Sequence, residues 1–399
     1  MGAVQKSNGE RRRLTILGST GSIGCSTLNV VAHNQASFDI AALVGNSNIE
    51  LLANQALSFR AELAVTADES RYEELAERLK GSGIEVAAGQ NAVIEAAQRP
   101  CDITMAAIVG AAGLEPTLAA AKQGAIIALA NKECLVCAGD VFLDTLQKTG
   151  TTLLPVDSEH SAVFQVLDQT QRDQIDKIIL TASGGPFRAY ELDALAAVTP
   201  KQALNHPNWD MGPKVTIDSS TLMNKGLELI EAYYLFPVKA EQLDAVIHRQ
   251  SIVHSLVAYK DGSVLAQMGE PDMKTPIAYA LGWPNRIPAP VKRLDLAAIG
   301  QLNFEPVDPQ KFPAVNLCLG CLERGGSATT VMNAANEVAV AEFLSKKLAY
   351  LEITRLIDAT LEAAEKDGMV AKLHSLEDVS SADTYGRERA SELARSLRR

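Results

Sequence analysis

The chain has no long hydrophobic run. Its longest apolar stretch, 105–114, is rich in glycine and alanine. It is much shorter than the roughly 18 to 20 residues that a membrane-spanning helix needs. The N-terminus also lacks the apolar core of a secretion signal. We therefore expect a cytoplasmic protein without a membrane partner, in which 105–114 forms a buried strand and a turn.

The chain has fewer basic than acidic residues. The 399 residues include 37 Lys and Arg against 48 Asp and Glu, which gives a net charge of -11. A nucleic-acid backbone needs a basic face, so we expect no nucleic-acid partner. The local basic runs at 11–13 and 387–399 are interpreted as solvated surface. The composition, 47% hydrophobic and 21% charged, is that of an ordinary chain long enough for two or three domains.

The cysteines lack the context of a metal site. Cys134 with Cys137 and Cys318 with Cys321 both have C-x-x-C spacing, and two such pairs can in principle close a tetrahedral zinc site. The pairs are far apart in the sequence, and each lies in an apolar segment without the glycines and polar residues of a zinc knuckle. We interpret them as buried, reduced thiols.

The first 150 residues predict an α/β domain of the Rossmann type. Short apolar runs alternate with helical patterns, which indicates a parallel sheet with crossover helices. We expect strands over 14–17, 40–44, 103–109 and 125–130. A glycine-rich turn follows the first strand and opens a helix, so that backbone N-H groups can meet a pyrophosphate. Its spacing is G-x-x-G-x-x-G rather than G-x-G-x-x-G, and a turn without a ligand remains the alternative.

The end of the second strand lacks the usual acidic residue. An NAD-specific domain places Asp or Glu there to bind the ribose 2'-hydroxyl, and this chain has Gly45, Asn46, Ser47 and Asn48. The missing acid favours NADP over NAD. No Arg or Lys stands in these four positions either, so the cationic partner of a 2'-phosphate is not visible.

Residues 151–283 predict a central α+β domain with a metal site near its start. An apolar run, 153–156, is followed directly by Asp157 and Glu159. If the run is a strand, both carboxylates leave its end on the same side and can converge on one cation. Glu228 offers a third carboxylate where a helical pattern opens. Ligands that are all oxygen favour Mg or Mn over Zn.

The same domain carries side chains suited to a phosphate. Strands are expected over 177–181, 215–217, 252–259 and 263–268, the last two joined in a hairpin across 260–262. Between them, Ser183, Ser219 and Asn224 offer hydrogen bonds and Lys225 offers a point charge. A serine beside two glycines is more often a turn residue, so the phosphate hypothesis depends on the concentration of these residues near the acidic side chains.

Segment 205–213 is interpreted as a lid over a ligand. It holds two prolines, a glycine and Trp209, whose ring would cover the ligand. A tryptophan of the core is the alternative, and His206 is either an anion ligand or an ordinary loop histidine.

The last third of the chain predicts a linker and a helical domain. Six prolines without periodicity indicate a surface linker over 284–313; they are Pro284, Pro288, Pro290, Pro306, Pro309 and Pro313. Amphipathic helices are expected over 328–348, 352–366 and 385–397, within an all-helical domain of residues 314–399. We assign no chemistry there, and we interpret Asn333, Asn336 and Glu337 as helix surface or inter-domain contacts.

Taken together, these motifs resemble the 1-deoxy-D-xylulose 5-phosphate reductoisomerase family. The resemblance runs in order through nearly the whole chain, at 18–24, 131–133, 155–160, 183–187, 206–209, 223–228 and 269–273. It implies an enzyme of isoprenoid precursor synthesis that depends on NADPH and a divalent metal and is a cytoplasmic homodimer. Such an enzyme rearranges the carbon skeleton of its ketose phosphate and reduces the resulting aldehyde to 2-C-methyl-D-erythritol 4-phosphate.

The resemblance also implies roles for individual residues. The metal would be held by Asp157, Glu159 and Glu228, which with Lys225 form the catalytic set. The substrate would be bound by Ser158, Glu159, Ser183, His206, Trp209, Ser219, Asn224 and Lys225. The cofactor would be bound by Gly18, Thr20, Gly21, Ser22, Ile23, Gly24, Gly45, Asn46, Ser47, Asn48, Asn131, Lys132, Glu133, Met211 and Gly212. Trp209 and Met211 would form the lid.

Two positions depart from the family pattern. Ser47 stands where some members carry a lysine near the 2'-phosphate, and Cys134 stands where a serine is common. The implied chemistry is otherwise consistent, because a metal held by three carboxylates can stabilise enolate or alkoxide character as a Lewis acid. Hydride delivery then needs only a nicotinamide placed against the aldehyde.

Three alternative functions are each consistent with part of the sequence. A short-chain dehydrogenase needs Tyr-x-x-x-Lys, and no tyrosine of this chain has a lysine four residues on. A semialdehyde dehydrogenase would use Cys134 or Cys137 as its nucleophile, which thiol alkylation would reveal. A non-catalytic NADP-binding sensor would need no metal carboxylates, and measured turnover would exclude it.

Overall fold

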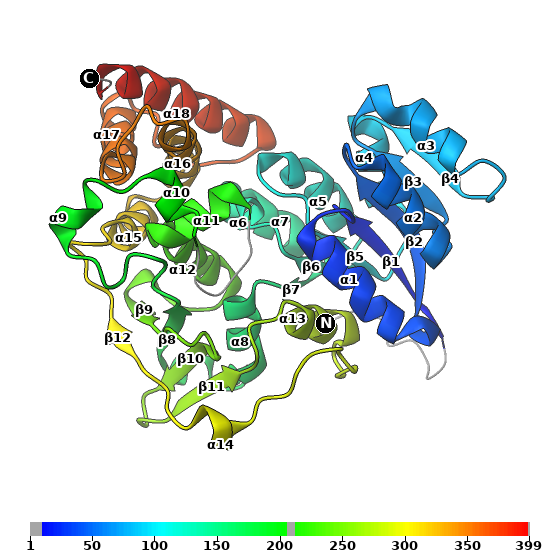
Figure 1. Ribbon diagram of the computed structural model, residues 1–399, viewed down its shortest axis with the longest axis horizontal. Helices are drawn as coiled ribbons and strands as arrows, with labels where there is room; N and C mark the ends of the chain where they lie inside the picture. Colours follow the sequence, from blue (N-terminus) through cyan, green and yellow to red (C-terminus); the bar gives the residue numbers. More distant parts are fainter. Residues whose placement is uncertain (1–9, 206–211, 398–399) are drawn as a thin grey trace. The chain divides into compact units, whose positions relative to one another are not determined.

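The computed structural model describes residues 10–205 and 212–397, which form two compact units (Figure 1). Unit 1 comprises Met1–Cys134, Phe142–Ser161 and Asp272–Lys292, and unit 2 comprises Leu135–Val141, Ala162–Pro271 and Arg293–Arg399. The predicted division at 150, 283 and 313 stays a prediction. By packing, the segment Asp272–Lys292 belongs with the N-terminal residues.

Unit 1 is built on a seven-stranded parallel sheet in the order β4-β3-β2-β1-β5-β6-β7. Its strands are β1 (Arg12–Leu17), β2 (Phe38–Gly45), β3 (Leu63–Thr66), β4 (Glu85–Ala88), β5 (Ile103–Ala106), β6 (Ile126–Leu129) and β7 (Thr152–Pro155). Every residue of β3, β5 and β6 is buried, as expected for parallel strands covered on both faces. The strand order reverses between β1 and β5, which is where parallel sheets of this type bind ligands.

Helices and short turns connect these strands. The helices are α1 (Ser22–His33), α2 (Ile49–Phe59), α3 (Tyr72–Arg78), α4 (Gln90–Gln98), α5 (Leu114–Ala121) and α13 (Lys274–Gly282). The 3-10 turns are η1 (Gln35–Ser37), η2 (Glu69–Arg71) and η3 (Ala111–Gly113). Helices α6 (Glu133–Val136), α7 (Gly139–Thr149) and α8 (Ser158–Val166) each contribute residues to both units.

Unit 2 contains a five-stranded mixed sheet in the order β11-β10-β8-β9-β12. Its strands are β8 (Ile175–Ala182), β9 (Leu243–Ile247), β10 (Val253–Tyr259), β11 (Val264–Met268) and β12 (Glu305–Pro306). Strands β10 and β11 form the predicted antiparallel hairpin, in which Gly262 has a φ of 88°. Buried side chains from the sheet, including Leu180 and Val257, pack with Leu229 and Phe236 in one core.

The remaining helices of unit 2 surround this sheet or form a bundle. They are α9 (Leu192–Leu195), α10 (Pro200–Ala203), α11 (Pro213–Ser220), α12 (Met223–Leu235), α14 (Leu296–Ile299), α15 (Ala314–Arg324), α16 (Ala328–Leu344), α17 (Glu352–Lys366) and α18 (Leu376–Leu397). The 3-10 turns η4 (Arg172–Gln174) and η5 (Ala240–Gln242) precede β8 and β9. Helix α16 packs against α17 and α18, which appear in orange and red in Figure 1. The predicted fold class is therefore confirmed.

Two details of the predicted secondary structure are wrong. Residues 215–217, expected as a strand, belong to α11, where Pro213 occupies the first turn and Thr216 Oγ1 donates to the Gly212 carbonyl. A proline in the first turn has a φ suited to a helix. The strand expected over 103–109 ends at Ala106. The predicted linker contains α14 and β12, and β12 pairs with β9.

No helix among the described residues is both long enough and apolar enough to span a membrane.

Candidate active site

The glycine-rich turn leaves β1 at the point where the strand order reverses. Gly18 has a φ of 91°, and a Cβ there would lie 2.6 Å from the Ala107 carbonyl oxygen. A Cβ on Gly24 would lie 2.3 Å from the Gly18 carbonyl oxygen. Gly21 directly precedes α1 and has no side chain to cap it. The turn therefore brings exposed backbone to a helix N-terminus, which is the arrangement that binds a pyrophosphate.

A side chain that the sequence analysis did not single out supports this turn. Gln55 of α2 is buried, and its Nε2 donates to the Ser19 carbonyl at 3.0 Å. Ser19 N in turn donates to Val44 O at 2.7 Å. The signal in the sequence that could have indicated this role is a polar residue on the apolar face of the second helix.

The end of β2 presents the expected polar side chains. Asn46, Ser47 and Asn48 are exposed, and the Asn48 side chain accepts a hydrogen bond from Leu51 N at 3.2 Å at the start of α2. A Cβ on Gly45 would lie 3.2 Å from the Thr20 methyl group, so the turn and the strand end are close together.

The segment after β6 contains one residue that holds the backbone, Asn131, and one that forms an ion pair, Lys132. The Asn131 amide donates to the carbonyls of Ile108 and Gly110, at 2.5 and 2.9 Å, and its oxygen accepts from Cys134 N at 2.9 Å. Asn131 is buried. The next residue, Lys132, forms an ion pair with Asp157, which follows the neighbouring strand β7. Glu133 begins α6.

The acidic residues lie at the start of α8. Asp157 directly precedes this helix, and its Oδ1 accepts a hydrogen bond from Glu159 N at 3.2 Å. The two carboxylates each offer an oxygen atom within 4.8 Å of the other. They converge because they belong to a helix N-terminus, whereas the sequence argument assumed a continuing strand. Ser158 Oγ donates to Glu159 Oε2 at 2.6 Å.

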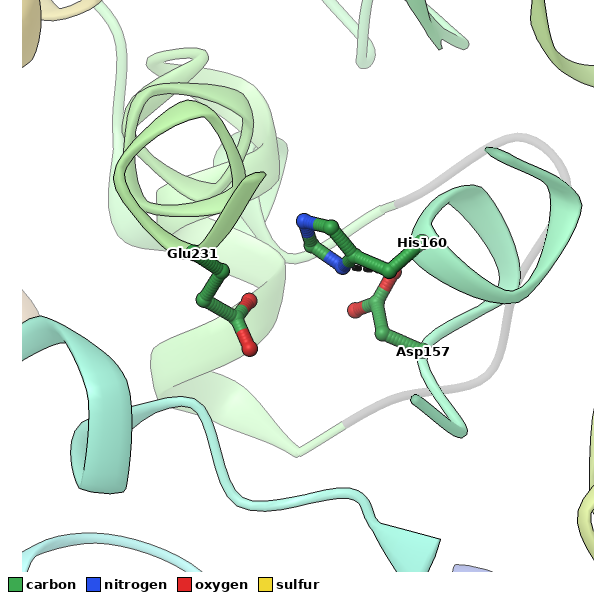
Figure 2. A group of neighbouring side chains, drawn as sticks. All are labelled: Asp157, His160 and Glu231. Carbon is green, nitrogen blue, oxygen red and sulfur yellow. Dashed lines mark ion pairs between the residues drawn. The ribbon is translucent and has the colours of Figure 1, made fainter. Parts of the chain in front are cut away.

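His160 supports Asp157 from within the first turn of α8. Its Nδ1 lies 3.3 Å from Asp157 Oδ1, and the ring is fully buried (Figure 2). Burial raises the pKa of the Asp157 carboxyl, but the charge of Lys132 and the hydrogen bond and charge of His160 outweigh it. The pKa of Asp157 therefore lies well below its usual range, and the group is a carboxylate at neutral pH. No role for His160 was predicted from the sequence.

In unit 2, two of the predicted phosphate-binding serines are brought together by a glycine. Gly185 has a φ of 61°, and a Cβ there would lie 2.9 Å from the Ser219 carbonyl oxygen. The Ser183 hydroxyl accepts a hydrogen bond from Gly185 N at 3.2 Å. Ser183 follows β8 and Ser219 lies near the end of α11, so the turn after the strand packs against the helix end.

Helix α12 presents three of the predicted residues on consecutive turns. Asn224 and Lys225 lie in its first turn, and each donates a hydrogen bond to the Glu228 carboxylate. Lys225 and Glu228 are buried. Glu231, labelled in Figure 2, follows one turn later and is also buried. A buried cation and carboxylate with this many donors are typical of a functional site.

Three predicted residues lie outside the described part of the chain. They are His206, Trp209 and Met211, and the proposed lid rests on them. Gly212 directly precedes α11 and is exposed.

Comparisons with known proteins identify the family of this chain. Three models of 1-deoxy-D-xylulose 5-phosphate reductoisomerase domains match residues 14–139, 153–236 and 268–389. A curated protein of that name from Rhodospirillum centenum is 53% identical over 382 residues, which are 96% of this chain and 94% of the relative. Another, from Rhizobium meliloti, is 52% identical over 387 residues, 96% of this chain and 98% of the relative. This chain belongs to the 1-deoxy-D-xylulose 5-phosphate reductoisomerase family.

Solved reductoisomerase structures share the fold. The Zymomonas mobilis enzyme, in complex with NADPH, has a TM-score of 0.91 and 47% identity, with 96% of this chain and 98% of that chain covered. A reductoisomerase in complex with NADPH, fosmidomycin and magnesium has a TM-score of 0.92 and 41% identity, with 97% and 99% covered. The predicted family and the prediction of an oxidoreductase are therefore confirmed.

The cysteines of the two C-x-x-C pairs are buried, as expected from the sequence. Cys134, Cys137, Cys318 and Cys321 are all buried thiols that take part in no disulfide. Burial raises the pKa of Cys318 well above its usual range and that of Cys321 to about 12. Thiols in this state are poor nucleophiles and poor metal ligands.

Proposed function

We propose that this chain converts 1-deoxy-D-xylulose 5-phosphate to 2-C-methyl-D-erythritol 4-phosphate, using NADPH and a divalent metal. The observation that carries the proposal is the pair of carboxylates, Asp157 and Glu159, at the carboxyl end of the parallel sheet that also presents the glycine turn. A family member that has both the carboxylate pair and the glycine turn can bind the metal for the rearrangement and the cofactor for the hydride transfer that follows.

Asp157, Glu159 and Glu228 are the proposed ligands of the metal. All three offer carboxylate oxygens, which suit Mg and also Mn. Asp157 and Glu159 are within 4.8 Å of each other, and Glu228 is a buried carboxylate that already attracts Lys225 and Asn224. The metal supplies Lewis acidity to the substrate oxygens while the carbon skeleton rearranges.

The substrate phosphate is assigned to the polar groups of unit 2. Ser183 and Ser219 are adjacent through Gly185, and both are half-buried, as is Asn224. Lys225 supplies a buried positive charge, which is strongest where water is excluded. Ser158, next to the metal carboxylates, is proposed to bind a substrate hydroxyl, and His206 and Trp209 keep their proposed contacts.

NADPH is assigned to unit 1. The glycine turn and the N-terminus of α1 would receive the pyrophosphate, and Asn46, Ser47 and Asn48 are exposed at the end of β2 for the 2'-phosphate. Lys132, Glu133, Met211 and Gly212 are proposed to contact the rest of the cofactor. Asn131 would act by holding the loop after β5.

A cytoplasmic homodimer is the proposed assembly, and an apolar groove beside the unit 2 sheet is its proposed contact surface. This groove has a volume of about 720 Å³ and is lined by residues that include Leu256 and Val264 of the sheet, Phe304, and Leu229 and Leu319 of α12 and α15. Val264 and Phe304 are 52% and 46% exposed. A large apolar patch of this kind usually marks an interaction site, and β11 is an edge strand that a second copy can cover.

A spectrophotometric assay tests the proposed reaction. NADPH oxidation is followed with 1-deoxy-D-xylulose 5-phosphate, with Mg, with Mn and after metal removal by EDTA. We expect turnover that requires both the substrate and the metal. NADPH binding without turnover would favour a sensor, and turnover that persists in EDTA but is lost on thiol alkylation would favour a cysteine-dependent dehydrogenase.

A further inference from the structure

Helix α11 is anchored to the C-terminal bundle through a buried carboxylate. Asp218 is 1% exposed, and its Oδ1 accepts a hydrogen bond from Asn336 Nδ2 of α16 at 3.0 Å. Its Oδ2 lies 2.8 Å from Lys214 Nζ, one turn earlier in α11. A buried carboxylate needs such partners, because an unpaired charge in the interior is costly.

The other side of Ser219 is anchored as well. Tyr350, between α16 and α17, donates its hydroxyl to the Ser220 carbonyl at 2.6 Å, and both residues are buried. The bundle therefore holds Asp218 and Ser220, the two residues that flank Ser219. Ser219 is the only one of the three that is not fully buried.

The turn after β8 approaches the same backbone from a third direction. The Cβ that Gly185 lacks would lie 2.9 Å from Ser219 O and 3.1 Å from Ser220 Cα. The backbone around Ser219 is therefore confined by α16, by Tyr350 and by the Ser183 turn, while the residue itself is only half-buried.

We propose that Asn336 is a positioning residue for the substrate phosphate, acting through Asp218 on Ser219. The inference rests on the proposed function, which assigns Ser219 to the phosphate. A hydroxyl contributes to binding in proportion to how well its geometry is held before the ligand arrives. The helical bundle, which showed no chemistry in the sequence, thereby contributes to substrate recognition without touching the substrate.

The chain offers a matched pair of variants. Asn336→Ala removes the hydrogen bond to Asp218. Asn333→Ala makes the same substitution one turn earlier in α16, at a residue that is equally buried and whose Nδ2 donates to Glu337 at 3.3 Å. Both variants lose one buried amide from the bundle, and only the first loosens α11.

Steady-state kinetics separate positioning from general destabilisation. For Asn336→Ala we expect KM for 1-deoxy-D-xylulose 5-phosphate to rise roughly tenfold, the usual effect of one hydrogen bond. The KM for NADPH should stay within about twofold of wild type, as should both KM values of Asn333→Ala. Equal substrate KM for the two variants would overturn the proposal.

A double-mutant cycle identifies the route. If Asn336 acts through Ser219, then Ser219→Ala combined with Asn336→Ala should raise the substrate KM no further than Ser219→Ala alone. Effects that multiply would show that Asn336 acts elsewhere, and would also overturn the proposal.

A binding measurement distinguishes this inference from the reaction itself. Inorganic phosphate should raise the unfolding temperature of wild type and of Asn333→Ala, and should raise that of Asn336→Ala less. If wild type fails to turn over the substrate but shows this pattern, the proposed function is wrong and the positioning role stands. If phosphate protects both variants equally, the positioning role is wrong whatever the activity.

Discussion

Gly185 is required at its position for two separate reasons. Its φ of 61° disfavours any L side chain, and a Cβ would contact the Ser219 carbonyl oxygen at 2.9 Å. The first property is shared by Gly262 in the β10–β11 hairpin, which has a φ of 88° and nothing within 4 Å of the added Cβ. Substitutions at these two glycines can therefore distinguish the effect of backbone strain from the effect of a close contact.

We expect Gly185→Ala to raise the substrate KM at least tenfold, while Gly262→Ala leaves it unchanged. Both substitutions should lower the free energy of unfolding by about 1–2 kcal/mol, because each places a methyl group in the left-handed region. Only the first pushes the Ser183 turn away from Ser219. Kinetics and urea unfolding of both variants check this, and a similar KM for the two would contradict the close packing of Ser183 and Ser219 as the cause.

A second substitution tests the metal site. Glu228→Gln should retain NADPH affinity and lose most metal-dependent turnover, because one anionic ligand becomes neutral while unit 1 is untouched. The control is Glu241→Gln, an exposed glutamate after the same helix. Turnover is measured against metal concentration, and near wild-type activity at limiting metal would exclude Glu228 as a ligand.

Helix α15 shows how packing between elements determines the state of the thiols. Gly226 of α12 lets α15 approach closely, since a Cβ there would lie 2.5 Å from Cys318 Sγ. Cys318 Sγ also lies 3.5 Å from Met223 Sδ. Cys318 and Cys321 are three residues apart on the buried face of α15. Packing of the two helices keeps both thiols away from water, which explains their raised pKa values.

The thiols should accordingly be inert in the folded protein. Cys134→Ser with Cys137→Ser should stay active, because both side chains are assigned to packing.

Cys318 and Cys321 should resist alkylation at pH 8. The pKa of Cys321 rises from 9.0 to about 12 on folding. Its stabilising contribution is therefore complete below pH 9 and is lost as the pH rises toward 12. Thiol titration with and without denaturant measures the shift in the Cys321 pKa. Loss of activity in a folded variant with Cys134→Ser and Cys137→Ser would instead favour the hypothesis of a cysteine nucleophile.

Element assignment from the sequence failed where local preference and surroundings disagreed. Residues 215–217 are three β-branched side chains that favour a strand, yet they lie in α11. The helix is favoured by Pro213 in its first turn and by the burial of Thr216, Ile217, Asp218 and Ser220. Strands β3 and β4 were not predicted. Both have only four residues, and β4 also contains two alanines and lies at the edge of the sheet, so the two segments carry little signal.

The assembly is tested by two apolar positions beside the unit 2 sheet. Val264→Lys with Phe304→Asp should convert the proposed dimer into a monomer, because both side chains line the same groove. Leu57→Lys, at a residue of α2 that is 45% exposed, is the control and should leave the dimer intact. Sedimentation analysis measures the result. A double variant that stays dimeric would place the contact surface elsewhere.

Motifs read along the chain were sufficient for the family and the fold class, because their chemistry depends on neighbours in sequence. The glycine turn and the Asp157 to His160 segment are of this kind. The supporting residues are not. Gln55, Asp218 and Asn336 act through partners 36 and 118 residues away, and only packing brings those partners together. A buried amide on a helix has the same local pattern whether it supports a site or a core, so the tertiary structure alone distinguishes the two.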